Sequence, residues 1–500
     1  MLTRGIAVGL ALLTLLPIGF VLARGLGSAP AAFGELEVLL TTIGLVALGT
    51  LLSLLVGSGL ALLIFEAQLP RWVDGLVLLP YLVPPFIGAT AWLAALGAGN
   101  PFTGQTIINL YGWSGILLAW TTHYAPLAYL LVRASLEAQS ASYSQAARVH
   151  GLSAAQTLLR VTLPLARPGL KSAAVLIALT LLGNFGVPAI MGFPAKVYTL
   201  ATLAYARLLN PTLTDALSAA SGVAVLLCLI ALPALALRSA DTNAAPSLGE
   251  RSAQGRGVAW AAVAIWFGVA SLIPLVSIGF LALKPAYVNG VTLEHYQLAF
   301  GLVQVQNGLR NSFVLALVSA ALTAGLGLLL AYTERSSRVV ALLNRLIGLS
   351  YLLPGTILAI GFILAYGGLQ GFYATPWILF VAYVLRFLTP GLQSARGGLE
   401  ARGNALEFAA RVHGVSKGVA FRRVVLPLLR PYLVATLLAV YPLALGEITL
   451  SSILYAPGAE TIGVAVLGLL NEGNLRAAAA VATLLIALSL PTLLISKRVA

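Results

Sequence analysis

The sequence predicts an all-α polytopic membrane protein, and three observations support this. Hydrophobic side chains make up 59% of the 500 residues and charged side chains only 9%, whereas soluble domains carry about 25% charged residues. Mean hydropathy is +0.96. The apolar residues gather in runs of about 20, the length that a helix needs to cross a bilayer. This composition excludes a soluble enzyme, a disordered chain and a nucleic-acid-binding protein, despite a pI near 10.1.

About twelve such runs lie along the chain, in two sets of six. Each is predicted to be a helix, because backbone N–H and C=O groups in lipid must be hydrogen-bonded within the segment. The first set lies near residues 5–23, 38–65, 75–97, 113–132, 172–192 and 215–237. The second set lies near residues 258–283, 311–332, 346–367, 377–395, 432–455 and 477–495. A short interfacial helix has room in segment 193–214 or in segment 456–476. The first run also resembles a signal peptide, but we expect a retained span, because the repeat described below needs it.

Basic residues are distributed unequally between the two sides of the predicted membrane. With the N-terminus inside, 22 of the 29 Lys and Arg residues fall on the cytoplasmic side and six fall outside. Arg386 is the remaining one and lies within a span. Cytoplasmic loops carry the excess of Lys and Arg in membrane proteins, so both termini are predicted to be cytoplasmic. The formal charge of +14 is therefore mainly an orientation signal.

The two sets of spans belong to related halves. Segments 136–168 and 399–431 align without a gap at an offset of 263 and are identical at 17 of 33 positions. Six spans, an even number, separate equivalent points, so the halves are predicted to be parallel repeats. We divide the chain into a first half at 1–240, a cytoplasmic linker at 241–257 and a second half at 258–500.

The repeated segment lies in the most basic cytoplasmic loop of each half, at 133–171 and 396–431. Helix-forming residues precede Gly151 and Gly414, which are expected to end a helix. Each loop is therefore predicted to form two short helices joined by a glycine turn. A hairpin that packs only on its own spans would not need to keep half of its positions, so we expect each loop to dock on a partner.

Both loops resemble a motif of the permease subunits of binding-protein-dependent ABC importers, E-A-A-x-x-x-G followed by Leu-Pro. This chain has QAARVHG and FAARVHG, with Pro164 and Pro427 at the expected spacing. The resemblance covers essentially the whole chain. It looks most like the fused permeases of ferric-iron importers, whose relatives carry thiamine, polyamines or phosphonates. The stretches 184–205 and 445–466 support this narrower resemblance.

The resemblance implies a type I ABC importer fold in the cytoplasmic (inner) membrane of a prokaryote. Each loop would form a coupling helix that seats on an ABC ATPase subunit, and two copies of that subunit would bind ATP and Mg²⁺. An extracytoplasmic solute-binding protein would deliver the solute. The chain itself would hold no cofactor, no metal and no catalytic residue, and its other contacts would be with membrane lipid and not with nucleic acid.

The resemblance also assigns the ATPase contact to residues of the two motifs and their flanks. These are Gln145, Ala146, Ala147, Gly151, Pro164, Glu407, Ala409, Ala410, Gly414 and Pro427. The leading glutamate of the motif is replaced by Gln145 in the first loop and by Phe408 in the second, where Glu407 stands one position earlier. This departure puts the salt bridge of that glutamate to the ATPase in question.

The sequence has no site of its own for ATP. No G-x-x-x-x-G-K-[ST] occurs, and the nearest match, at 169–172, lacks the glycine beside its lysine. His150 and His413 are expected to be loop residues rather than metal ligands. The single cysteine, Cys228, excludes a disulfide framework. The outer loops carry no acidic cluster, so ligands for an iron cargo would belong to the binding protein.

Four polar residues lie at membrane depth and at equivalent places in the two halves. Glu447 corresponds to Asn184, and Arg386 corresponds to His123, both at the offset of 263. Ionisable groups within a span are costly and usually functional. One interpretation places Asn184 and Glu447 in the translocation pathway, with His123 and Arg386 supporting its gate. The other is a structural ion pair of Arg386 with Glu447, or hydrogen-bonded packing.

A gradient-driven secondary transporter with 12 spans is the alternative from another class. Such transporters carry a G-x-x-x-D-R-x-G-R-R-like loop after the second span, but here residues 66–74 are EAQLPRWVD. The longest basic loops are instead 133–171 and 396–431. A membrane enzyme or channel has no supporting constellation of residues. The sequence therefore favours an ABC permease.

Overall fold

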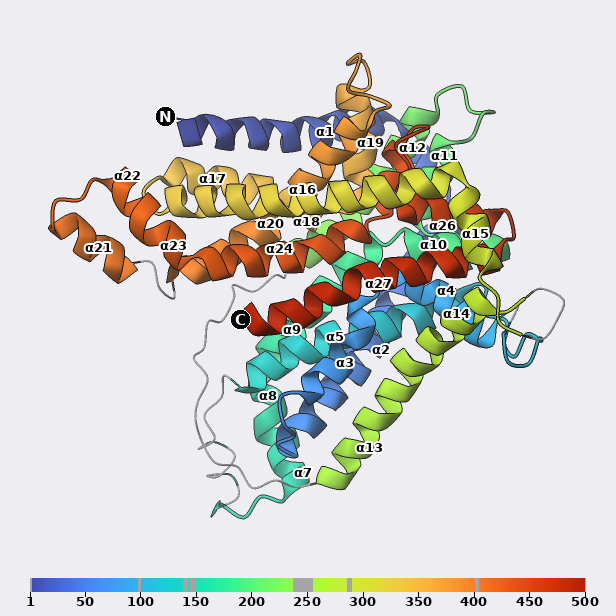
Figure 1. Cartoon of the computed structure of the whole chain (residues 1–500), viewed down its shortest axis with the longest axis horizontal. Helices are drawn as coiled ribbons and strands as arrows, with labels where there is room; N and C mark the ends of the chain where they lie inside the picture. The colour runs from blue at the N-terminus through green and yellow to red at the C-terminus, as the bar shows by residue number, and fades with distance from the viewer. Residues whose placement is uncertain are drawn as a thin grey trace. The chain divides into compact units, whose positions relative to one another are not determined.

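The computed structural model describes residues 2–97, 100–137, 143, 147, 149–236, 255–285, 290–400 and 404–499. The described residues form helices and no strand (Figure 1), which confirms the all-α class. Among these residues, seven helices are long and apolar enough to cross a membrane, or eleven if each of four bent helix pairs counts as one span. The predicted count of twelve is therefore not confirmed. The last predicted span falls on α27 (Leu475–Val499), whose first part, Leu475–Ser489, is a shorter apolar helix.

The helices form two compact units that do not follow the two halves of the sequence repeat. The larger unit comprises Met1–Gly34, Leu203–Leu226 and Thr292–Ala500, and the smaller unit comprises Glu35–Thr202 and Leu227–Val291. The first span of each half is thus grouped with the helices of the other half. Most of the predicted linker, residues 241–254, lies outside the described residues.

The smaller unit is centred on α2 and α5, which pack along each other. Its elements are α2 (Leu36–Glu66), α3 (Val73–Leu82), α4 (Pro85–Leu96), α5 (Trp113–Glu137), α7 (Ala154–Thr157), η1 (Leu158–Thr162), α8 (Leu163–Leu165), α9 (Arg167–Leu182), α10 (Gly186–Met191), η2 (Phe193–Ala195), α13 (Arg256–Phe267), η3 (Gly268–Leu272) and α14 (Ile273–Leu283). A Cβ on Gly57 of α2 would lie 2.1 Å from the carbonyl oxygen of Ala125 in α5. The missing side chain therefore lets the two backbones touch.

The larger unit contains a cluster of α16, α20 and α24, each of which packs against the other two (Figure 1). Its elements are α1 (Leu2–Phe33), α15 (Glu294–Gly301), α16 (Val303–Glu334), α17 (Arg338–Ile347), α18 (Leu349–Leu352), α19 (Gly355–Tyr366), α20 (Pro376–Gly398), α21 (Asn404–Val412), α22 (Lys417–Ala420), η5 (Phe421–Val425), α23 (Leu426–Leu428), α24 (Arg430–Leu445), α25 (Thr449–Leu454), α26 (Ile462–Asn471) and α27. Ala7 and Ala11 of α1 join Leu328 and Leu388 in its core. The remaining helices, α11 (Leu200–Leu208) and α12 (Ala216–Ala236), each include residues assigned to both units. Helices α11 and α26 lie in the two segments that had room for a short helix.

Several predicted spans are broken rather than continuous. The span expected at 75–97 is α3 followed by α4 with a bend of 94°, and the span expected at 346–367 ends in α19 after a bend of 109°. Pro84 and Pro354 precede the second helix of each pair. A proline disfavours helical geometry in the residue before it, and its ring removes one N–H donor. The spans expected at 172–192 and 432–455 also stop midway, after α9 and α24, and continue as α10 and α25.

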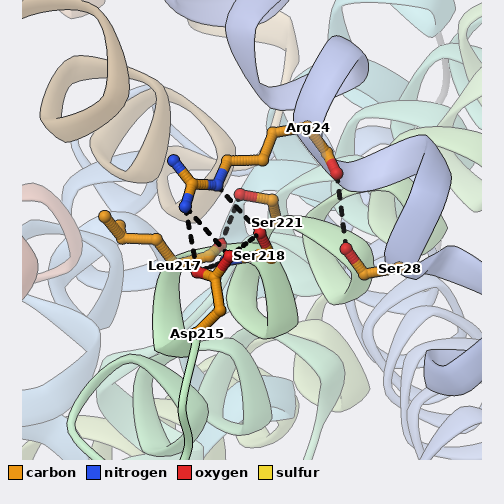
Figure 2. Close-up of polar contacts among 6 residues, drawn as sticks. All are labelled: Arg24, Ser28, Asp215, Leu217, Ser218 and Ser221. Atoms are coloured by element: carbon orange, nitrogen blue, oxygen red, sulfur yellow. Dashed lines mark hydrogen bonds and ion pairs between the residues drawn. The ribbon is translucent and has the colours of Figure 1, made fainter.

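An ion pair fastens α1 to the start of α12 within the larger unit (Figure 2). Arg24 Nη2 donates to both carboxylate oxygens of Asp215 at 3.0 Å, and Arg24 Nε donates to Ser218 Oγ at 2.8 Å. Asp215 also accepts from the backbone N–H of Ser218 at 2.9 Å. The hydrogen bonds from Ser218 and then from Arg24 lower the pKa of Asp215 to about 2. Gly25 permits this approach, because a Cβ there would lie 2.4 Å from the carbonyl oxygen of Ser221.

Candidate functional site

The second repeated loop folds as predicted, into two short helices joined by a glycine turn. Helix α21 ends at Val412, and the turn after it contains Gly414, whose φ of +80° is a conformation that side-chain-bearing residues rarely adopt. The N–H of Val415 donates to the carbonyl of Ala410 at 3.1 Å, and the N–H of Gly414 donates to the carbonyl of Arg411 at 3.0 Å. This pair of bonds is a Schellman motif, which satisfies carbonyls that the helix end would otherwise leave free. Pro427 lies beyond the turn, in α23.

Helix α21 carries apolar side chains on its outer surface. Phe408 is 71% exposed, Val412 68% and Leu406 52%. Phe408 and Val412 are four residues apart and so share one face of the helix. Ala409 is exposed as well, and Ala410 is half-buried. Large exposed apolar side chains gathered on one helix indicate an interaction surface.

Glu407, by contrast, turns into the fold. The residue is 8% exposed, and its Oε1 accepts a hydrogen bond of 2.6 Å from Tyr332 Oη at the end of α16. Its Oε2 lies 3.7 Å from Nη1 of Arg335. The carboxylate therefore ties α21 to the end of α16. Glu407 is consequently occupied within this chain rather than presented on the outer face of the loop.

A cavity of about 560 Å³ lies beside this contact. Its lining includes Tyr332, Arg335, Glu407, Arg411 and Lys417. The Lys417 ammonium lies 5.5 Å from the centre of the Tyr332 ring, a cation–π contact. It also donates a hydrogen bond of 3.1 Å to Oγ of Ser336. The cavity thus combines three cationic side chains with one carboxylate.

The first repeated loop is described in part, and Gln145 and Ala146 lie outside the described residues. Gly151 has a φ of +81°, matching Gly414. The N–H of Leu152 donates to the carbonyl of Ala147 at 3.1 Å, in the same pattern as in the second loop. Ala147 itself is 8% exposed. The glycine turn is therefore common to both loops.

The helix that follows this turn has a reciprocal cap. The N–H of Gln156 donates to Ser153 Oγ at 3.3 Å, and the N–H of Ser153 donates to Gln156 Oε1 at 3.0 Å. This is a capping box. Pro164 lies two elements further on, in α8, and a bend of 50° separates Leu159–Leu165 from α9.

One arginine at the base of each loop is paired with acidic side chains, and neither arginine was among the predicted site residues. Arg133 in α5 lies 3.4 Å from Oδ1 of Asp74 and 3.1 Å from Oε1 of Glu137. Arg396 in α20 donates from Nη2 to Oε2 of Glu334 at 2.7 Å. The two arginines are equivalent at the offset of 263. That shared position was the signal in the sequence that would have identified them.

Asn184 and Glu447 have the same structural role in the two halves. Asn184 Oδ1 accepts from the N–H of Val187 at 3.2 Å, and Glu447 Oε1 accepts from the N–H of Leu450 at 2.9 Å. Each side chain therefore caps the short helix, α10 or α25, that follows a broken span. Asn184 Nδ2 also donates to Tyr124 Oη at 3.0 Å.

His123 and Arg386 likewise lie at equivalent breaks. His123 Nδ1 is 3.2 Å from the carbonyl oxygen of Pro80, just before the break between α3 and α4. Arg386 Nη1 donates to the carbonyls of Ser350 at 3.0 Å and Leu353 at 2.6 Å, before the break between α18 and α19. Arg386 thus bonds carbonyl groups, not Glu447, so the expected ion pair between those two residues is not what the structure shows. Hydrogen-bonded packing, the other structural interpretation, describes this geometry.

Metal chemistry finds no support in the part of the chain that the structure describes. Within it, no group of three or more His, Cys, Asp or Glu residues is arranged to hold a metal ion. Cys228 is a buried free thiol. His413 is exposed in the glycine turn of the second loop.

The fold and the duplicated loops define a class, the polytopic helical membrane proteins built from two related halves, each with one loop that contains a glycine turn. The family described as the binding-protein-dependent transport system inner membrane component matches residues 49–242 and 323–500, which is more than half of the chain. The chain belongs to this family. The expected resemblance to the fused permeases of ABC importers is thereby confirmed.

Two of the similar proteins are ferric permeases by name. One is a putative ferric transport system permease protein, FbpB 1, of Haemophilus influenzae, 25% identical over 77% of this chain and 64% of its own length. Another is the ferric transport system permease protein FbpB of Actinobacillus pleuropneumoniae, 25% identical over 83% of this chain and 64% of its own length. This chain therefore spans less than two thirds of both relatives.

A third similar protein has a different named solute. It is a putative 2-aminoethylphosphonate transport system permease protein, PhnV, of Salmonella paratyphi A. The identity is 26%, over 50% of this chain and 96% of the relative.

Proposed function

We propose that the chain is the permease subunit of an ABC importer, forms the path of the solute through the membrane and has no enzymatic activity of its own. The observation that carries the proposal is that each of the two repeated loops has a glycine turn and that the second loop exposes the apolar side chains of α21. The family description, a component of binding-protein-dependent transport, supports it.

In this proposal the loops face the cytoplasm, as do both termini, and each loop docks on one of two copies of a separate ATPase. The ATPase binds ATP and Mg²⁺, and its closure moves the two halves of the permease. A solute-binding protein delivers the cargo from the other side of the membrane. The clustering of basic residues in the loops supports this orientation, because positive charge is retained on the cytoplasmic side.

The geometry refines the proposed coupling contacts. Ala409 and Gly414 are exposed beside Phe408 and Val412 and would touch the ATPase directly. Glu407 and Ala147 are buried and would instead support the contact. Gln145, Ala146, Ala410, Pro164 and Pro427 complete the proposed set.

We also keep Asn184, Glu447, His123 and Arg386 as proposed pathway or gate residues, now for a structural reason. All four side chains hold the ends of broken helices. A break in a membrane helix is tolerated where it is buried or lines a cavity, and the breaks of transporter spans are where solute sites form.

Ferric iron is the proposed cargo, because the similar proteins from Haemophilus influenzae and Actinobacillus pleuropneumoniae are ferric permeases by name. A phosphonate is the second candidate, since the similar protein from Salmonella paratyphi A is a permease for 2-aminoethylphosphonate by name. Thiamine and polyamines are alternatives that the sequence resemblance also allows.

Uptake into membrane vesicles tests the proposal. Vesicles that contain the permease and its ATPase, supplied with ATP and the binding protein, should accumulate radioactive iron. Vesicles without the ATPase should not, and phosphonate, thiamine and polyamine are offered in parallel. Uptake that proceeds on an ion gradient without the ATPase would identify a secondary transporter and refute the proposal.

A further inference from the structure

The cavity beside α21 carries positive charge that its own lining does not balance. Arg335, Arg411 and Lys417 contribute three cations, and Glu407 is the one carboxylate among the described lining residues. That carboxylate is already engaged by the Tyr332 hydroxyl and by Arg335. Lys417 contacts the Ser336 hydroxyl and the Tyr332 ring, and neither group neutralises its charge. An anionic group would therefore be stabilised between Arg411 and Lys417.

The cavity shares a wall with the exposed apolar face of α21. Arg411 and Val412 lie three and four residues after Phe408, so both side chains are neighbours of Phe408 on the helix surface. Phe408 also lines the cavity. A partner that buries Phe408 and Val412 must therefore approach the cavity as well. This shared surface favours a protein as the source of the anion over a free phosphate or a lipid head group.

The chemistry of the cavity belongs to the second loop. At the offset of 263, Ser144 and Ala154 stand where the second loop has Glu407 and Lys417. Counted from the glutamates that end α2 and α16, Ile64 stands in place of Tyr332. The first loop thus lacks the carboxylate, the lysine and the aromatic hydroxyl, although it keeps the glycine turn.

We propose that the cavity beside α21 is a socket for a carboxylate side chain of the ATPase subunit, which binds between Arg411 and Lys417 at the second loop alone. The inference rests on the proposed function. Glu407 is then a positioning residue, because it holds Tyr332 and Arg335 while Arg411 and Lys417 meet the partner. At this loop the permease would supply the positive side of the ionic contact and the ATPase the negative side.

Zero-length cross-linking tests the contact directly. A carbodiimide activates a carboxylate and joins it to a lysine amine only when the two are in contact, and Lys417 is one of five lysines in the chain. The full-length permease in complex with its ATPase should give a cross-link from Lys417 to an acidic residue of the ATPase. Lys417→Arg keeps the charge but removes the reactive amine, so this variant should bind the ATPase normally and lose that cross-link. A bound complex without any cross-link at Lys417 overturns the socket.

Charge reversal measures how much the contact contributes. Arg411→Glu combined with Lys417→Glu should weaken ATPase binding at least about tenfold and make it less sensitive to salt, because two attractions become repulsions. Arg338→Glu is the matched control, since Arg338 is exposed nearby in α17 and does not line the cavity. If Arg338→Glu and the double variant lose ATPase affinity equally, the socket proposal is refuted.

The same binding assay separates the possible failures. It is run in nanodiscs of neutral lipid and in nanodiscs with anionic lipid, with inorganic phosphate added in a further arm. If the double variant loses ATPase binding only in anionic lipid, the cavity binds a lipid phosphate and the carboxylate proposal is refuted. The same conclusion follows if inorganic phosphate alone blocks ATPase binding by the wild type. If the wild-type permease fails to bind any ATPase, the proposed function itself fails. If wild type binds and the double variant binds equally well, only the socket fails.

Discussion

The two turn glycines allow the docking assignment to be tested at a small structural cost. Gly151 and Gly414 have φ values of +81° and +80°, and an added Cβ at either position meets no described atom within 4 Å. A substitution is therefore opposed by the backbone conformation rather than by a steric clash. A residue with a Cβ in this left-handed region costs about 1–2 kcal/mol. That cost lowers the population of the turn about 5–30-fold.

We expect Gly414→Ala to weaken binding of the ATPase by the same factor, since the loop must regain its turn to dock. Gly414→Asn should lose less, because Asn adopts the left-handed region more readily. Gly151→Asp together with Gly414→Asp adds a charge at both contacts and should abolish subunit assembly and solute-stimulated ATP hydrolysis, while insertion into the membrane stays normal.

Binding is measured on the purified permease and ATPase, and hydrolysis on the reconstituted complex. Gly418→Ala is the control, because Gly418 lies in α22 of the same loop with open space around it and without a positive φ. Normal coupled transport in the double Asp variant would refute the docking assignment. Equal effects of Gly414→Ala and Gly418→Ala would show that the turn geometry is not what the partner recognises.

Four further predictions test the packing and the polar contacts. Gly327→Leu should destabilise the protein in detergent by about 1–3 kcal/mol and so lower its melting temperature. The reason is that a Cβ at this position would lie 2.6 Å from a backbone carbon of α20. Gly325→Leu, at an open position, should leave the melting temperature unchanged. Tyr332→Phe removes a hydrogen bond to a carboxylate, worth about 1.5–3 kcal/mol, and should speed amide hydrogen exchange in α21; unchanged exchange would contradict the tie between α16 and α21. Arg386→Ala should destabilise the protein by about 1–3 kcal/mol for each carbonyl left without a donor, and Arg386→Lys should recover part of the loss in thermal melts. The pKa of Asp215 is lowered from 3.8 to about 2, so its ion pair should stabilise the protein fully above pH 3.8 and be lost as the pH falls through 2. The melting temperature of an Asp215→Asn variant should therefore depend less steeply on pH in this acid range than that of the wild type.

Much of the fold follows from local patterns in the chain. The apolar runs predicted helices, and the glycine after each AARVH segment predicted a turn that both loops show, with φ near +80° in each. Both features depend on consecutive residues, so hydropathy and backbone preference suffice to predict them. The bends after Pro84 and Pro354 were missed, because a run of apolar residues looks alike whether its helix is straight or broken.

The polar contacts were harder to predict. The repeat alignment correctly paired Asn184 with Glu447 and His123 with Arg386, but not their partners. Both pairs bond backbone groups at helix breaks, and no pattern of side chains along the chain reveals a free carbonyl or N–H that appears only once a helix stops. The hydrogen bond between Glu407 and Tyr332 was equally hard to predict, because these residues are 75 positions apart in the sequence.

The residues alone thus establish a helical membrane protein with two related halves and a repeated loop in each, because composition, periodicity and internal repetition are properties of the chain itself. Only the packed structure decided which side of α21 is exposed and that its glutamate points inward. It also grouped the first span of each half with the helices of the other half. These features depend on which surfaces come together when distant segments fold, and contacts of that kind leave no trace in the local sequence.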